Sequence, residues 1–215
     1  MSLRNLWIGV GVMLAVACSN PADNTPDAIV SDAVSAPVAA ATAADDATAV
    51  RYVITPDSKI EFTGSKVTGK HDGGFRNFTG TIHYVEGDPG ASRVEVSIDL
   101  NSMWTDNDRV TSHLKTDDFF DVPNFPEATF RSTNVVAEGD HYLVSGDLAM
   151  HGITKNVTFP AHIEVVDGEI RAQAEFDIRR FDWGIQYQGR ADDLVRDEVV
   201  IRLNIIARPE SGVQS

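Results

Sequence analysis

The sequence predicts an all-β domain over residues 51–208, an antiparallel β-barrel with one short helical insertion. Aromatic and β-branched residues alternate with polar ones throughout this region, which is the two-residue period of strands with one apolar face. Glycine-containing turn sequences separate the alternating segments. The domain contains no cysteine and so no disulfide, which means that a packed interior must stabilise it. A two-layer sandwich has the same pattern, but a closed barrel leaves no exposed sheet edge, and we therefore favour the barrel.

The clearest strand is residues 93–100. Its apolar side chains share one face, and charged or polar side chains share the other. The same period recurs around Ile60 and Phe62; Phe78, Ile82 and Tyr84; Tyr142, Val144 and Leu148; Val157, Phe159, Ile163 and Val165; Ala172, Ala174, Phe176 and Ile178; and Val199, Ile201, Leu203 and Ile205. Turn sequences at 86–90, 138–140 and 167–168 lie between these segments, so about seven or eight short strands are expected.

One segment departs from the strand period. Over residues 106–120, Val110 and Leu114 have helical spacing, and Phe119 extends the pattern. Pro123 follows and cannot continue a helix. The sequence therefore predicts a helix over residues 106–120.

The first residues have the features of an export signal. Arg4 precedes an apolar run at 6–17 that is too short to span a bilayer, and small residues lead up to Cys18. This arrangement resembles a bacterial lipoprotein signal peptide, although Ala15 stands where a larger aliphatic residue is usual, and an ordinary secretory signal is the alternative. Cys18 is the only cysteine, and an exported chain seldom keeps an unused thiol. We therefore expect residues 1–17 to be a signal peptide and Cys18 to be lipidated.

Residues 18–50 connect this signal to the domain. The stretch after Cys18 is rich in Ala, Asp, Pro, Thr, Ser and Val and has no aromatic or basic residue before Arg51. Such a composition buries too little apolar surface to order the backbone. We expect a disordered tether here and a short tail at residues 209–215.

The net charge excludes two classes of partner. The chain has 32 acidic and 18 basic side chains, a formal charge of −14. This charge opposes the phosphate backbone of nucleic acids, so no nucleic-acid partner is expected. It also opposes attachment to anionic lipid through a basic surface. Membrane attachment must then come from the N-terminal lipid anchor.

The sequence has no pattern typical of catalysis or metal binding. None of the six histidines is spaced as a metal-ligating pair, and no nucleophile elbow, phosphate loop or dinucleotide motif is present. Pairs of adjacent carboxylates lie at 45–46, 117–118 and 192–193. The two groups of such a pair could have different pKa values, as acid–base catalysis requires, but carboxylates adjacent in sequence usually face solvent. We expect no catalytic residue, no metal and no cofactor, and therefore no enzyme.

Several motifs of the domain resemble the YceI-like family. They span nearly all of residues 51–208, in the order and spacing of the family. They are Phe75, Phe78 and Gly80; His113-Leu114-Lys115; Asp118-Phe119-Phe120-Asp121; Phe125-Pro126; Ala128-Thr129-Phe130; the segment 146–155; and Phe181-Asp182-Trp183-Gly184-Ile185. Many members have an Arg-Asp pair shortly before the His-Leu, whereas here the order is Asp108-Arg109, which leaves the role of Arg109 open. Trp183 replaces a frequent Phe.

This resemblance implies an extended, lipocalin-like barrel of eight antiparallel strands. It also implies an elongated interior tunnel for a polyisoprenoid chain, as in an isoprenoid quinone or a polyprenol, and no catalytic residues. Burying about twenty chain carbons at roughly 0.8 kcal/mol each gives on the order of 16 kcal/mol before the costs of association. A ligand of this kind needs few polar contacts, so no conspicuous site motif is required.

The residues expected on the tunnel wall share the apolar faces of the best-patterned strands, with plain core packing as the alternative for each. They are Val94, Val96, Ile98, Leu100, Val144, Phe159, Ile163, Phe176, Ile201 and Leu203. The helical insertion is expected to plug or gate one barrel end with His113, Leu114, Phe119 and Phe120. Gly152 is expected to serve a tight bend, and Lys155 to be solvated.

Three functions follow from these expectations. The first is an envelope lipoprotein that binds isoprenoid lipid for transport, storage or sequestration on the periplasmic side, with the outer membrane as the expected site of its anchor. The second is a non-catalytic structural module with a solid barrel core. The third is an enzyme acting on a lipid head group through Asp118 or His113. Association of two barrels into a homodimer stays open.

Overall fold

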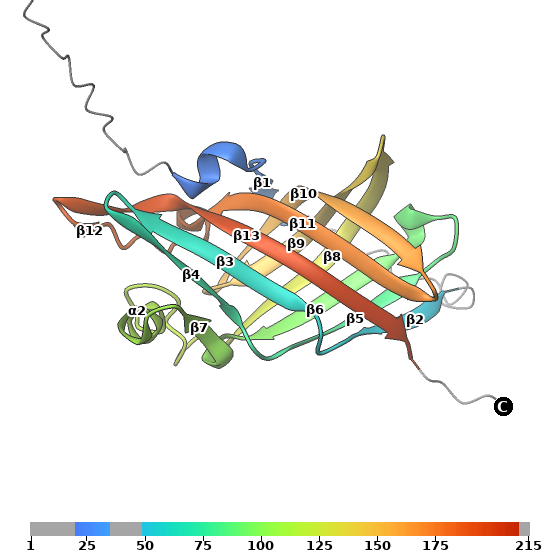
Figure 1. Ribbon diagram of the computed structural model, residues 1–215, viewed down its shortest axis with the longest axis horizontal. Helices are drawn as coiled ribbons and strands as arrows, with labels where there is room; N and C mark the ends of the chain where they lie inside the picture. The colour runs from blue at the N-terminus through green and yellow to red at the C-terminus, as the bar shows by residue number, and fades with distance from the viewer. Residues whose placement is uncertain (1–19, 35–48, 211–215) are drawn as a thin grey trace, which may run out of the picture.

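The computed structural model describes residues 20–34 and 49–210 (Figure 1). The expected signal peptide at 1–17, Cys18 and most of the tail at 209–215 lie outside the described residues. Within the described ranges, no helix is both long enough and apolar enough to cross a membrane.

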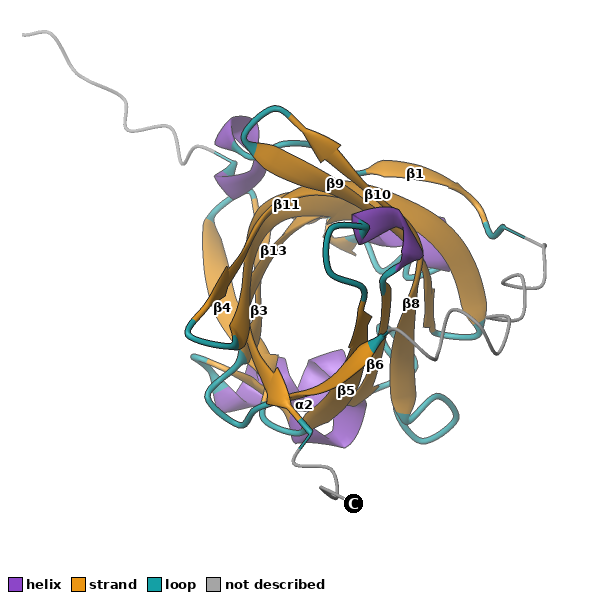
Figure 2. Cartoon of the chain, turned by 90° about the vertical axis from the view of Figure 1, so that its right-hand side faces the viewer, coloured by secondary structure: helices purple, strands orange, loops and turns teal. Residues whose placement is uncertain are grey.

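The domain is a closed, eight-stranded antiparallel barrel. Figure 2 shows the ring of strands from one end. Three of the barrel strands are each interrupted once and carry two labels. The strands are β2 (Val50–Ile54) with β3 (Lys59–Lys66), β4 (Gly69–Phe75) with β5 (Phe78–Tyr84), β6 (Arg93–Asp99) with β7 (Met103–Thr105), β8 (Glu127–Glu138), β9 (His141–Met150), β10 (Ile153–Val166), β11 (Glu169–Arg179) and β13 (Asp193–Pro209). The predicted eight-stranded antiparallel barrel is confirmed.

The long strand β13 closes the barrel. It pairs with β11 on one side, and with both β3 and β2 on the other. Its 17 residues span roughly 55 Å at about 3.3 Å per residue. The barrel is accordingly elongated along its strands (Figure 1).

Short elements complete the structure. They are η1 (Pro21–Asn24), β1 (Ile29–Asp32), η2 (Pro89–Ala91), η3 (Leu100–Ser102), α2 (Asp108–Leu114), η4 (Arg180–Trp183) and β12 (Gly189–Arg190). Leu100, predicted as the last residue of a strand, instead begins η3, because the Asp99 carboxylate accepts a hydrogen bond from the Asn101 backbone N–H and turns the chain. The Leu100 side chain nevertheless stays buried in the core.

The helical insertion is shorter than predicted. α2 begins after Asn107, whose side chain accepts hydrogen bonds from the first backbone N–H groups of the helix, and it ends at Leu114. Turns follow, in which the Phe120 N–H donates to the Leu114 carbonyl and Asp121 has a φ of 45°. The predicted helix through residue 120 is wrong because the backbone turns after Leu114, where the Phe119 N–H donates to the Thr116 carbonyl, and this turn brings the Phe119 ring against Tyr187.

Part of the expected tether is ordered. Residues 21–24 form η1, and β1 pairs antiparallel with β10. The expectation of disorder over residues 18–50 is therefore wrong for residues 20–34. β10 pairs with β11 only near their shared hairpin, so the rest of that edge of β10 is available to pair with β1. This pairing orders the N-terminal segment, and composition alone does not reveal it.

The hairpin between β9 and β10 turns on two residues. His151 and Gly152 have φ values of 51° and 74° and connect the paired residues Met150 and Ile153. The prediction that Gly152 serves a tight bend is confirmed. Lys155, which was expected to be solvated, instead forms an ion pair with Asp32 of β1 at 2.8 Å, because β1 is ordered alongside it.

Candidate functional site

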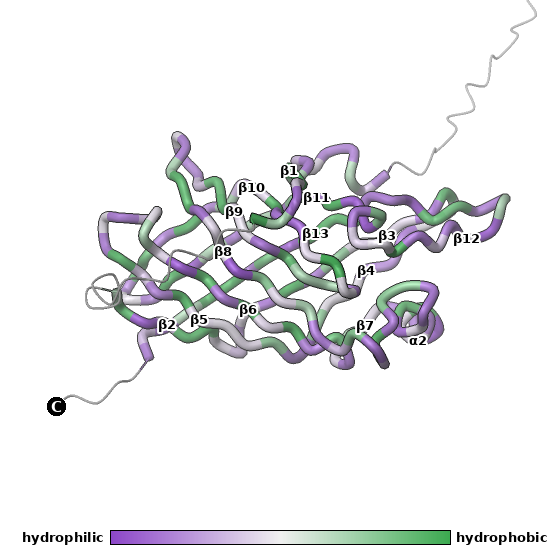
Figure 3. The backbone as a smooth tube through the Cα atoms, turned by 180° about the vertical axis from the view of Figure 1, so that it is seen from behind, coloured by the Kyte–Doolittle hydropathy of each residue, from purple (hydrophilic) through white to green (hydrophobic). Residues whose placement is uncertain are grey.

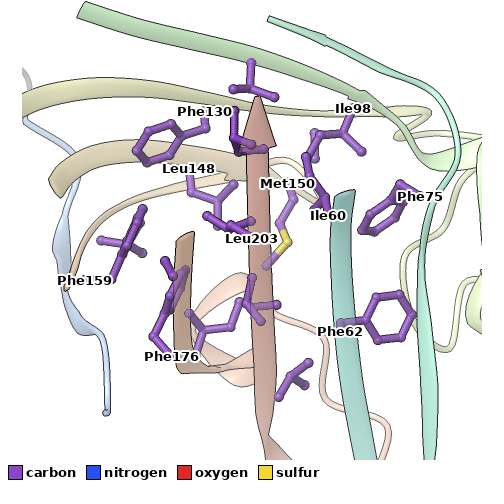
Figure 4. A pocket seen from close by; sticks show the side chains of 18 of the residues that line it. Ile60, Phe62, Phe75, Ile98, Phe130, Leu148, Met150, Phe159, Phe176 and Leu203 are labelled. Carbon is purple, nitrogen blue, oxygen red and sulfur yellow. The ribbon is translucent and has the colours of Figure 1, made fainter. Parts of the chain in front are cut away.

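The interior of the barrel is hollow. A cavity of about 1050 Å³ runs through it, and roughly 300–1000 Å³ is usual for a ligand pocket. All eight barrel strands contribute side chains to its wall, and most of these side chains are aliphatic or aromatic. Figure 4 shows Phe130, Leu148, Phe176 and Leu203 among the side chains that line it. This cavity contradicts the alternative of a solid barrel core.

All of the residues predicted for the tunnel wall line this cavity. They are Val94, Val96, Ile98, Leu100, Val144, Phe159, Ile163, Phe176, Ile201 and Leu203. Their contact with a ligand stays a prediction.

The alternation of β13 explains why the wall is apolar. Val199, Ile201 and Leu203 line the cavity, while Arg202 between them forms an ion pair with Glu175 of β11 at 3.3 Å. Arg202 also donates a hydrogen bond to the Thr63 hydroxyl of β3 at 2.7 Å. A slip of one residue in register would turn Arg202 into the cavity, so these outer contacts fix the apolar inner face. Figure 3 shows the same mixture of hydrophobic and hydrophilic positions along the barrel strands.

Aromatic rings form part of the wall on one side. The rings of Phe159 and Phe176 stack with their centres 4.2 Å apart and their planes at 9°. Phe130 extends the group, with its ring centre 6.0 Å from that of Phe159. These rings give an apolar ligand a broad and rigid contact surface.

A second aromatic cluster lies at the end of the cavity near α2. The rings of His113, Phe119 and Tyr187 contact one another with centres 4.9–5.1 Å apart. The residues expected to gate the tunnel, His113, Leu114, Phe119 and Phe120, all line the cavity. Sequence reasoning missed Tyr187, because it lies in a loop with no periodic pattern. The gating itself stays a prediction.

The His113 ring also contacts an acidic side chain. Its Nε2 lies 2.8 Å from Asp118 Oδ2, and both side chains are partly exposed. The carboxylate fixes the orientation of the imidazole, which meets Phe119 and Tyr187 edge-on. His113 lines the cavity end, whereas Asp118 orients its ring from outside the lining. Among the residues that the structure describes, no group of three or more His, Cys, Asp or Glu side chains could hold a metal ion.

Arg180 is a buried cation at the same end, and sequence reasoning did not identify it. Its guanidinium lines the cavity, is 5% exposed, and donates hydrogen bonds to the carbonyls of Ile185, Tyr187, Val195 and Arg196 at 2.5–3.2 Å. Burial lowers the pKa of the Arg180 guanidinium. Arg180 thus holds the loop that carries Tyr187 against the start of β13. Its neighbour Arg179 is exposed, and nothing in the sequence distinguishes the two.

The opposite end of the cavity carries tyrosines. Tyr84 and Tyr142 line it there, and the Tyr84 ring meets Tyr52 edge-on at 6.0 Å. Burial, and then the nearby carboxylate of Glu86, raises the pKa of Tyr84, so this phenol keeps its proton at neutral pH. Polar groups thus lie toward both ends of the cavity, with an apolar length between them. The arrangement suits an elongated apolar molecule with a polar group at one end.

Comparison with known proteins places the chain in a family. A family model described as the YceI-like domain matches residues 52–207. Protein YceI of Salmonella arizonae is 41% identical over 91 residues, which cover 42% of this chain and 48% of that protein. Protein YceI of Salmonella paratyphi B matches to the same extent. The chain spans about half the length of the curated relatives that it matches.

Two solved structures share the fold. BcnA of Burkholderia cenocepacia superposes with a TM-score of 0.64 at 22% identity, over 69% of this chain and 95% of that one. A polyisoprenoid-binding domain from Saccharophagus degradans superposes with a TM-score of 0.62 at 19% identity, over 75% of this chain and 99% of that one. Because the family model extends from β2 to β13 and covers the whole barrel, this chain belongs to the YceI-like family.

Proposed function

We propose that the protein binds a long isoprenoid lipid, of the isoprenoid quinone or polyprenol type, in the barrel cavity. The observation that carries this proposal is an apolar cavity of about 1050 Å³ with polar side chains toward its ends. The Saccharophagus degradans domain, described as polyisoprenoid-binding, has the same fold and supports the choice of ligand. A binding role accounts for the cavity without any catalytic group.

The cavity wall makes this ligand class energetically reasonable. A flexible chain that leaves water for an aliphatic and aromatic wall gains roughly 25 cal/mol for each Å² of apolar surface buried. The chain loses conformational freedom on entry, so the net affinity is far smaller than the gross gain. Selection among lipids then depends on chain length and on the fit of the head group to the polar side chains near the cavity ends.

Native mass spectrometry of protein purified without detergent tests the binding directly. We expect an apolar adduct whose extract contains an isoprenoid chain. Protein stripped of lipid should take up an added isoprenoid quinone or prenol. A mass equal to that of the bare polypeptide, together with no uptake of either compound, would contradict the proposal.

We further propose that the protein is anchored in the cell envelope through a lipid on Cys18 and carries, stores or sequesters its ligand on the periplasmic side. The signal-like residues 1–17 and the single cysteine support this location. Replacing Cys18 with Ser is expected to move the protein from the membrane pellet into the soluble envelope fraction. Ser35→Ala is a suitable control because it leaves the cysteine in place. Equal membrane retention of the Cys18→Ser and Ser35→Ala variants would rule out lipidation as the anchor.

A further inference from the structure

The barrel wall has a seam between β10 and β11. These strands pair from Val166 back to His162 in β10, matched by Glu169 to Gln173 in β11. Beyond this point β11 continues to pair with β13, and β10 continues to pair with β9. Among the described residues, no direct pairing joins the Asn156 region of β10 to the Asp177 region of β11.

The chain's own N-terminal segment fills this seam. β1 pairs antiparallel with β10, from Ile29 opposite Thr158 to Asp32 opposite Lys155. Just before β1, the Ala28 N–H donates to the Asp177 carbonyl at 2.9 Å, and the Asp177 N–H donates to the Pro26 carbonyl at 3.0 Å. The segment therefore hydrogen-bonds to both edges of the seam.

The inner face of the segment covers the side chains that line the cavity. Val30 lies opposite Val157, and directly paired residues in a sheet point to the same side. Val157 lines the cavity, and Ala28 and Val30 pack against the hydrophobic core. Ile29, on the other face, is exposed. β1 thus packs behind the side chains that line the cavity, at the place where β10 and β11 separate.

A buried carboxyl group lies where the segment crosses β11. Asp177 is 2% exposed, and its side chain accepts a hydrogen bond from the Thr25 hydroxyl at 3.1 Å. A second acidic residue, Asp27, lies beside it, because the two residues form a parallel β-bridge. Ionisation of Asp177 in the docked state would therefore place a negative charge in a buried position next to another acidic residue.

The other charged groups near Asp177 do not neutralise its carboxylate. Glu198 of β13 adds a further negative charge. Lys155 of β10 is engaged by Asp32 at 2.8 Å, and Arg179 of β11 pairs with Asp182 of η4 at 3.6 Å. Burial first, and the charge of Asp27 in addition, raises the pKa of Asp177 to about 6.

We propose that residues 21–32 form a releasable strand at the seam of the barrel wall, docked most tightly while the buried Asp177 carboxyl is protonated and loosened when it ionises, so that its departure opens a lateral route to the cavity. The proposal does not depend on which ligand occupies the cavity. It assigns to the N-terminal segment a part in controlling access to the barrel.

The direction of the pH effect follows from the pKa of Asp177. In the docked state this pKa is about 6, against an ordinary value of 3.8 that we assign to the released state. Docking is then strongest below the ordinary value, weakens as the pH rises to about 6, and changes little above that. This difference in pKa corresponds to a decrease of up to roughly 100-fold in the equilibrium constant for docking.

Hydrogen exchange measures the docking directly. Backbone amides of β1 and of Asp177 are followed at about pH 4 and about pH 7.5, after correction for the intrinsic exchange rate. We expect their protection to fall by ten- to a hundred-fold between the two conditions. Amides shared between β8 and β9 serve as an internal reference for the folded barrel. Equal protection of β1 at both pH values, with the reference amides intact, would overturn the proposal.

Two variants separate the Asp177 carboxyl from other causes. Asp177→Asn keeps the size of the side chain but cannot ionise, so its β1 protection is expected to be high and independent of pH. Asp32→Asn removes the ion pair with Lys155, so it should lower β1 protection at both pH values and keep the dependence of protection on pH. A dependence on pH that persists in Asp177→Asn would overturn the role of Asp177.

Entry of an apolar fluorophore such as phenylnaphthylamine tests the lateral route. The wild-type protein is expected to take it up faster at about pH 7.5 than at about pH 4. Asp177→Asn should be slow at both values. Val30→Asp, which puts a charge on the inner face of β1, should be fast at both. Identical entry rates in all three proteins would refute the lateral route, while a lack of any uptake even at long times would refute the apolar binding cavity itself.

Discussion

Leu203→Trp is expected to block uptake of a long isoprenoid chain while the barrel stays folded. Leu203 lines the cavity between Ala174 of β11 and Ile60 of β3, so a larger side chain there projects into empty space. We expect affinity for a long-chain prenol to fall at least about tenfold, which is roughly 1.4 kcal/mol. Titration of lipid-free protein with a fluorescent prenol measures this change.

The thermal midpoint decides between a cavity and a packed core at this position. An overpacked core loses about 1–3 kcal/mol on such a substitution, whereas a residue facing a void is expected to change the midpoint by less than about 3 °C. Val53→Trp is the matched control, because Val53 lies on β2 and is 37% exposed. It should leave both affinity and midpoint unchanged. Unfolding of Leu203→Trp, or unaltered prenol binding in that variant, would contradict the proposed ligand path.

Arg180→Met is expected to cause the largest loss of stability. The substitution leaves four backbone carbonyls, those of Ile185, Tyr187, Val195 and Arg196, without their donor in a buried position. At about 1–3 kcal/mol for each unsatisfied group, and with water able to replace some of them, we expect a loss of about 3 kcal/mol or more in the free energy of unfolding. Denaturant unfolding followed by tryptophan fluorescence measures it through the transition midpoint.

Two further variants identify the cause of that loss. Arg180→Lys keeps the charge but lacks the planar fork of donors, so it should recover only part of the stability. Arg171→Met removes an exposed arginine that pairs with Glu169 at 3.1 Å, and its effect should stay within about 0.5 kcal/mol. If Arg180→Met were no more destabilising than Arg171→Met, the guanidinium would have no role in holding the loop.

The sequence was sufficient to predict the barrel and its inner surface. Alternation in segments such as 93–100 determines which side chains face inward, and that alternation depends only on the pleat of a strand. Val94, Val96 and Ile98 therefore line the cavity as predicted. Whether the interior would be filled or hollow could not be determined in this way, because the same residues serve either arrangement.

Most of the features that the sequence did not predict depend on contacts between distant segments. Arg180 donates hydrogen bonds to backbone carbonyls up to 16 residues away. Every residue type has such a carbonyl, so the sequence does not indicate this contact. Tyr187 comes from a loop that only the fold brings to Phe119. β1 is ordered because β10 and β11 separate, and a polar composition does not prevent a segment from pairing its backbone. Local pattern predicts elements, but it does not predict where an element leaves backbone groups unpaired.

The closure of the ring by β13 has a consequence for biogenesis. The last strand of the domain to be synthesised pairs with the first, β2, and with β3, so the ring cannot form until nearly the whole chain has emerged. Contacts of such high sequence separation make folding slow. Until these contacts form, the incomplete sheet exposes its apolar face and two unpaired edges, which promotes aggregation. A chaperone that covers the incomplete sheet, or a lipid bound before the barrel closes, would shorten the period in which aggregation can occur.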